Sequence, residues 1–80
     1  MPRLRRLSSR DVLRILHRFG FEVFTQRGSH AKLVRVSAGE RQILIVPLHR
    51  NLATGTLQAI YRQAARLVPS VDLRRAFFLD

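Results

Sequence analysis

Two very short turns divide the middle of the chain into three apolar segments, and this spacing limits the fold more than any other feature. The turns fall at Arg27-Gly28 and at 37–40, where Ser, Ala, Gly and Glu follow one another. Apolar residues are frequent in the three segments, which cover 21–26, 29–36 and 42–46, and Pro47 ends the last. Because turns of this length join antiparallel neighbours, the sequence predicts a three-stranded antiparallel meander.

A helix is predicted before these strands, over about 9–19. Ser8 or Ser9 can cap its first turn, and Gly20 can end it in a left-handed conformation. Apolar residues at helical spacing give it one stripe, made of Val12, Leu13, Leu16 and Phe19.

A second long helix is predicted after the strands. It begins where the hydroxyl of Thr54 or Thr56 can cap it, and it ends near Val68, before Pro69. A short final helix follows, over about 71–78. The buried stripe of the long helix is made of Leu57, Ile60, Tyr61 and Ala64, and the short helix would pack through Leu73, Phe77 and Phe78.

The order of these elements predicts an α+β fold. An antiparallel sheet can bury one face and leave the other in water, so both long helices are expected on the same face of the sheet. Alternation along the middle strand puts Ala31 and Leu33 on one side. It puts His30, Lys32 and Val34 on the other side, on a face open to a ligand.

Length and cysteine content narrow the class of protein further. Eighty residues suit one domain, 1–80, with a basic N-terminal extension at 1–7 and a short C-terminal helix at 70–79. The absence of cysteine excludes disulfides and thiolate metal sites. It suits a reducing cytoplasm, where we expect the protein. No long apolar segment follows the basic N-terminus, so a secretory signal is not expected.

The charge balance points to an anionic partner. Fifteen Lys and Arg oppose five Asp and Glu, for a net charge of +10, and every cation except Lys32 is an arginine. Arginine's planar fork suits phosphate oxygens, so nucleic acid is the leading partner class. An acidic protein could use the same field. A membrane partner is not expected, because the cations are spread along the whole chain and no apolar run reaches the roughly 18 residues of a membrane span.

The segment Gly28-Ser29-His30 carries the clearest chemical signal. The imidazole of His30 can change protonation near neutral pH, and Arg27 and Lys32 place fixed positive charge on both sides of it. A proton-transfer group beside cations is what cleavage of a polyanion needs. The alternative reading is an ordinary surface histidine on a hairpin.

Several blocks of sequence occur in an order and at spacings that are specific for so short a chain. They are Phe19-Gly20-Phe21, Gln26-Arg27-Gly28-Ser29-His30, Val46-Pro47-Leu48-His49, Gly55-Thr56-Leu57 and Ile60 to Ala65. Together they resemble the HicA toxins of bacterial toxin–antitoxin systems, over about Arg6 to Leu79.

This resemblance carries expectations about fold, activity and partner. It implies a double-stranded-RNA-binding-like αβββα fold and a translation-independent ribonuclease that cuts mRNA. It also implies a HicB-type antitoxin that covers the active site. In that family the histidine of Gly-Ser-His is catalytic, and here that histidine is His30. The resemblance gives no catalytic role to His49, and the basic N-terminus and longer tail depart from the family pattern.

RNA cleavage of this kind needs neither a metal nor another cofactor. RNA carries its own nucleophile, the 2′-hydroxyl, and His30 can act on it as general acid/base. The group that protonates the leaving 5′-oxygen stays open between His49, water and His30 itself. His17, His30 and His49 lack the spacing of metal ligands, so no metal site is expected.

Seven further residues are candidates for RNA binding. Arg27 and Lys32 can contact phosphates, although cations also protect strand edges. Gly28 can let the backbone approach the ligand and Ser29 can bond RNA, although both also suit an ordinary turn. Arg50, Thr54 and Thr56 lie where a helix begins, and free N–H groups there favour anions. Threonines at this position more often only cap the helix.

Two rival functions use the same features. One is a non-catalytic module that binds double-stranded RNA, although Arg50 is the only cation close before Thr54. The other is a small basic protein that binds an acidic protein, with its charge used for steering. The aromatic residues Phe19, Phe21, Phe24 and Tyr61 are expected in the core rather than as platforms for bases.

Overall fold

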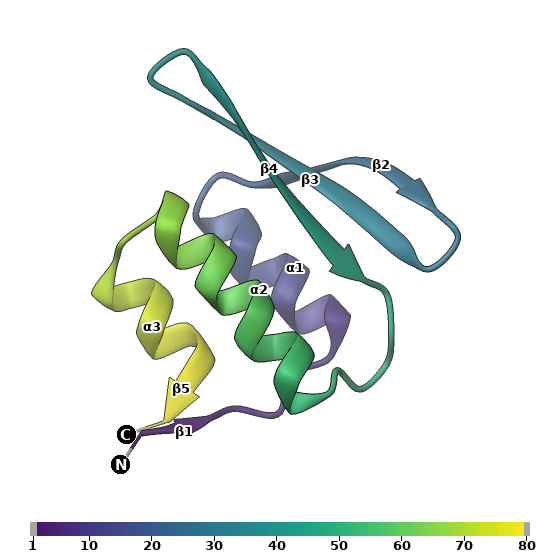
Figure 1. Cartoon of the computed structure of the whole chain (residues 1–80), viewed down its shortest axis with the longest axis vertical. Helices are drawn as coiled ribbons and strands as arrows, with labels where there is room; N and C mark the ends of the chain where they lie inside the picture. Colours follow the sequence, from purple (N-terminus) through teal and green to yellow (C-terminus); the bar gives the residue numbers. More distant parts are fainter. Residues whose placement is uncertain (1, 80) are drawn as a thin grey trace.

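The fold is one three-stranded antiparallel sheet with helices on one side of it, seen in a computed structural model that describes residues 2–79 (Figure 1). The predicted α+β, αβββα arrangement is confirmed. The helices α1 and α2 cover one face of the sheet, and the short helix α3 lies beside α2. The elements are β1 (Arg3–Leu4), α1 (Ser9–Arg18), β2 (Glu22–Arg27), β3 (His30–Ser37), β4 (Glu40–Pro47), α2 (Thr54–Leu67), α3 (Val71–Phe77) and β5 (Phe78–Leu79).

The helix α1 begins at a capping box. The Ser8 hydroxyl accepts a hydrogen bond from the Asp11 N–H at 3.1 Å, and the Asp11 carboxylate accepts one from the Ser8 N–H at 3.0 Å. This pairing satisfies two N–H groups that a helix start leaves free. Gly20, with a φ of +95°, follows the C-terminal end as predicted.

The predicted threonine cap of α2 is wrong. The helix begins at Thr54, its N-cap is Ala53, and no side chain bonds the first turn. Leu52 is buried and its N–H donates to the Leu7 carbonyl. That contact places Ala53 at the position that a capping threonine would need, so Thr54 and Thr56 lie inside the first turn.

The middle strand divides its side chains as the alternation predicts. Ala31 and Leu33 are each 1% exposed and face the helices, whereas His30 is exposed on the far side. The register pairs His30 with Arg27 of β2 and with Pro47 of β4. In β2 the register shifts between Val23 and Thr25, which marks a bulge at Phe24.

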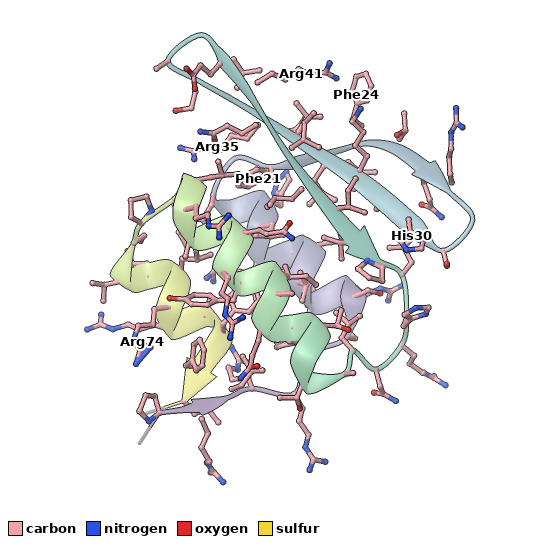
Figure 2. The ribbon with its side chains drawn as sticks, viewed as in Figure 1. Phe21, Phe24, His30, Arg35, Arg41 and Arg74 are labelled. Atoms are coloured by element: carbon pink, nitrogen blue, oxygen red, sulfur yellow. The ribbon has the colours of Figure 1, made fainter. Side chains whose placement is uncertain are left out.

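The core is entirely apolar among the described residues. It lies between the inner face of the sheet and the helices, and Figure 2 shows Phe21 in this layer. Its buried members are Leu7, Val12, Ile15, Leu16, Phe21, Ala31, Leu33, Leu44, Val46, Leu52, Leu57, Ile60, Ala64, Leu73, Ala76 and Phe77.

The two ends of the described chain meet. Arg3–Leu4 pairs with Phe78–Leu79, and the Arg5 N–H donates to the Phe77 carbonyl at 2.8 Å. The stretch expected as a basic extension at 1–7 therefore includes a strand, and its Leu7 is buried. The helix expected over 70–79 spans Val71–Phe77, and a strand follows it. Met1 and Asp80, the ends of the expected domain, lie outside the described residues.

None of the helices within residues 2–79 is both long and apolar enough to cross a membrane.

Candidate active site

The β2–β3 hairpin holds the Gly-Ser-His segment at one end of the sheet. Gly28 and Ser29 form its two-residue turn, and Arg27 and His30 are the last pair of the ladder. Gly28 lies in the turn as predicted and has a φ of +53°. Two-residue hairpin turns need a positive φ at their centre, which glycine adopts without steric cost.

The backbone around His30 is fixed from both sides while its ring stays in solvent. Pro47 of β4 lies opposite His30 in the ladder, and the Leu48 N–H donates to the Ser29 carbonyl at 2.6 Å. The ring is exposed, and its Nδ1 lies 3.5 Å from the Ser29 hydroxyl. The backbone bonds therefore fix where the side chain begins, and the exposed imidazole is open to a substrate.

Positively charged side chains lie beside the His30 ring. A depression of about 370 Å³ on this end of the sheet is lined by Arg27, His30 and Lys32, with Thr25, Ala31 and Ile45 completing it. Figure 2 shows His30 at the turn end of β3. The structure therefore brings together three of the residues singled out in the sequence, one for proton transfer and two with fixed positive charge.

The residues near the start of α2 do not line this depression. Arg50 lines a separate hollow with Ser8, Ser9 and Arg10 at the start of α1, and Thr54 lines another hollow beside it. Thr56 is half-buried. Two backbone hydrogen bonds link these regions. The Leu48 N–H donates to the Ser29 carbonyl, and the Ser9 N–H donates to the His49 carbonyl at 3.1 Å.

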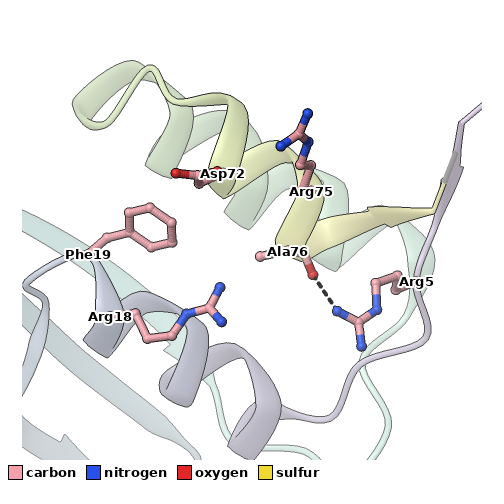
Figure 3. A pocket seen from close by; sticks show the side chains of 6 residues that line it. All are labelled: Arg5, Arg18, Phe19, Asp72, Arg75 and Ala76. Carbon is pink, nitrogen blue, oxygen red and sulfur yellow. Dashed lines mark hydrogen bonds between the residues drawn. The ribbon is translucent and has the colours of Figure 1, made fainter.

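A larger cavity of about 530 Å³ lies between α1 and α3, away from His30 (Figure 3). Three arginines, Arg5, Arg18 and Arg75, surround it, and Arg5 donates to the Ala76 carbonyl at 2.9 Å. The other lining residues are Phe19 and Asp72. Guanidinium groups attract anions but do not exchange protons near neutral pH, so this cavity lacks the chemistry that the His30 depression has.

One prediction about the aromatic residues is wrong. Phe24 was expected in the core with Phe19, Phe21 and Tyr61, but 60% of its surface is exposed. It belongs to an edge strand whose six residues are all exposed. Alternation from Glu22, which pairs with Val34 on the outer face, puts Phe24 on that face too, so only its hydrophobicity pointed to the core.

Within residues 2–79, no three His, Cys, Asp or Glu side chains gather as ligands for a metal ion.

Comparison with known families gives one match. A family model described as the HicA toxin of bacterial toxin–antitoxin matches residues 9–65, which is more than half of the chain. The matched stretch runs from the start of α1 into α2 and includes the hairpin with His30. No curated protein and no solved structure matches significantly.

Proposed function

Because the chain belongs to the HicA toxin family of bacterial toxin–antitoxin systems, we propose that it is an endoribonuclease that cleaves mRNA without a metal ion. His30 is its catalytic residue and acts as general acid/base. The observation that carries this proposal is the depression where the exposed His30 ring lies with Arg27 and Lys32.

The reaction follows from the chemistry of RNA. His30 takes the proton of a ribose 2′-hydroxyl, and the 2′-oxygen attacks the adjacent phosphorus. The bond from phosphorus to the 5′-oxygen breaks, which leaves a 2′,3′-cyclic phosphate and a 5′-hydroxyl that takes its proton back from His30. The nucleophile is part of the substrate, so the protein supplies a base and stabilises charge.

The neighbours of His30 bind the phosphates. Arg27 and Lys32 stabilise the charge that develops on the phosphoryl oxygens. The turn at Gly28 and Ser29 has no bulky side chain, so the RNA backbone can approach it closely. Arg50, Thr54 and Thr56 bind phosphates further along the strand, next to the segment 48–50 that adjoins the turn.

The partner that controls this activity is a HicB-type antitoxin. An acidic protein surface complements a chain with a net charge of +10. By covering the His30 depression, the antitoxin keeps mRNA away from the imidazole. The compartment in which both proteins meet mRNA is the cytoplasm.

The test compares the protein with its His30→Ala variant on a long mRNA, with a chelator present. We expect loss of a general base to slow cleavage by about 10²–10⁴-fold without loss of folding, because the ring is exposed. His17→Ala is the matched control, since His17 is also exposed, and it should cleave normally. His49→Ala, assayed alongside, should also cleave.

Two results would contradict the proposal. Unchanged cleavage by His30→Ala would remove the catalytic role of that residue. RNA binding with no cleavage product in any buffer would leave the non-catalytic RNA-binding module as the function.

A further inference from the structure

The outer face of the sheet carries an aromatic ring that is largely open to solvent. Phe24 is 60% exposed, and it lies with Arg41 on the side of the sheet away from the helices (Figure 2). Exposing a phenyl ring to water costs free energy that burial would recover.

Phe24 lies on the outer face by regular alternation from Glu22, which pairs with Val34 on that face. The register then shifts, and the bulge that follows adds Thr25 to the same face opposite Lys32. Bulges re-aim single side chains and are frequent beside active sites.

Two cations flank the ring. The Arg41 guanidinium carbon lies 4.6 Å from the centroid of the Phe24 ring, and the Lys32 ammonium lies 5.8 Å from it. The outward positions of β3 and β4 hold no carboxylate; they are His30, Lys32, Val34, Val36, Arg41, Ile43, Ile45 and Pro47. On β2, the outer face holds the carboxylate of Glu22, which pairs with Val34, against the cations Arg27, Lys32 and Arg41, so the field over this face is positive on balance.

This surface continues into the candidate active site. Lys32 lines the His30 depression and also lies over the Phe24 ring. Thr25, which follows Phe24 in β2, lines the same depression. A strand of RNA whose phosphate is at Lys32 therefore has a base within reach of Phe24.

We propose that Phe24 is a base-stacking residue, which holds a nucleobase of the single-stranded RNA segment next to the bond that is cut. Arg41 and Lys32 bind the phosphates on either side of that base. This inference rests on the proposed ribonuclease function. Aromatic rings beside a basic groove bind successive bases of single strands in this way, with little dependence on sequence.

The charges favour RNA over a protein partner. Exposed Val36, Ile43 and Ile45 add apolar surface to the same face, and a protein could also cover them. An apolar protein surface would bury Arg41 and Lys32 without an anion to pair with, and burying unpaired charge is costly. RNA offers a flat apolar base and an anionic phosphate together.

The test measures RNA binding in the His30→Ala background, where the RNA stays intact. The probe is an unstructured RNA of about 12 nucleotides labelled with fluorescein, followed by fluorescence anisotropy. Phe24→Ala and Phe24→Leu should weaken binding by roughly 5- to 150-fold, as expected for loss of one stacked base. Phe24→Tyr should keep the parent affinity. The control, Val71→Ala, removes an exposed apolar side chain on α3 and should also keep it.

A second measurement reports stacking on the parent protein itself. An RNA with 2-aminopurine in place of single bases should lose fluorescence at one position when it binds the parent protein, because stacking quenches the probe. Phe24→Leu should restore that fluorescence.

The outcomes separate this inference from the proposed function. If Phe24→Leu binds as tightly as the parent, or if no 2-aminopurine position is quenched, the stacking role is overturned while cleavage through His30 stands. If the Phe24 variants change self-association or antitoxin binding and leave RNA binding intact, the face is a protein surface and the inference is overturned. If the wild-type protein neither binds nor cuts RNA, the proposed function fails and this inference fails with it.

Discussion

Gly28 is the first residue of the β2–β3 turn and Gly39 is the second residue of the β3–β4 turn, and together they test what the His30 turn does. Both have a positive φ, +53° and +79°, and a Cβ added at either would meet no atom within 4 Å. Alanine at either position therefore costs only backbone strain, about 1–2 kcal/mol of the free energy of unfolding. Denaturant unfolding should show similar losses for Gly28→Ala and Gly39→Ala. Only Gly28→Ala should also slow RNA cleavage, because strain there shifts His30. Equal cleavage by both variants would show that the turn does not position the ring.

For single residues, the sequence predicts which side chains of a regular strand face outward, but it does not predict a bulge. His30 and Lys32 lie on the outer face as predicted, because β3 keeps a regular register with β4 over its whole length. Phe24 was assigned to the core on its hydrophobicity alone. Regular alternation from Glu22 puts Phe24 on the outer face, and the bulge, which the sequence does not mark, then puts Thr25 and Arg27 on that face as well.

At the level of single helices, the stability of the N-terminal end of α1 depends on pH. The hydrogen bond from the Ser8 backbone N–H, and then the bond with the Ser8 hydroxyl, lower the pKa of Asp11 below its usual 3.8. A carboxylate with a depressed pKa in the folded state stabilises the protein above the unfolded value and loses this effect as pH falls through the folded value. Asp11→Asn should therefore reduce the free energy of unfolding at neutral pH, and the gap to the parent should close below pH 3.8. Urea titrations at neutral and strongly acidic pH measure this gap, and a gap that stays constant would contradict the capping role.

The starts of α1 and α2 also show which caps a sequence can reveal. Ser8 could be predicted, because a serine followed three residues later by an acid is a local signature. The threonines of α2 offered a similar local signal, but the N-cap is Ala53. The contact between Leu52 and Leu7 decides where α2 begins. These two residues are 45 positions apart, so the local sequence around α2 does not predict their contact.

Across the whole molecule, composition predicted an anionic partner but not where that partner binds. Cations lie on α1, α2 and α3 and on all three strands of the sheet. Only the fold shows that Arg27 and Lys32 share a depression with an imidazole, whereas Arg5, Arg18 and Arg75 surround a cavity without one. Sequence spacing brought Arg50 and Thr54 into the same candidate set. The path of the chain places them beside other hollows, at the start of α1.

The positions of these arginines predict how the affinity for RNA depends on salt concentration in different variants. Each phosphate contacted on a single strand contributes about 0.7 to the slope of log affinity against log salt concentration. In the His30→Ala background, Arg27→Gln should reduce that slope by about one contact, because Arg27 lines the depression where the phosphate binds. Arg75→Gln removes the same charge from the cavity between α1 and α3 and should leave the slope unchanged. Anisotropy titrations of a short single-stranded RNA at several salt concentrations give both slopes. If the two variants lower the slope equally, RNA binds the positive surface as a whole and Arg27 makes no defined phosphate contact.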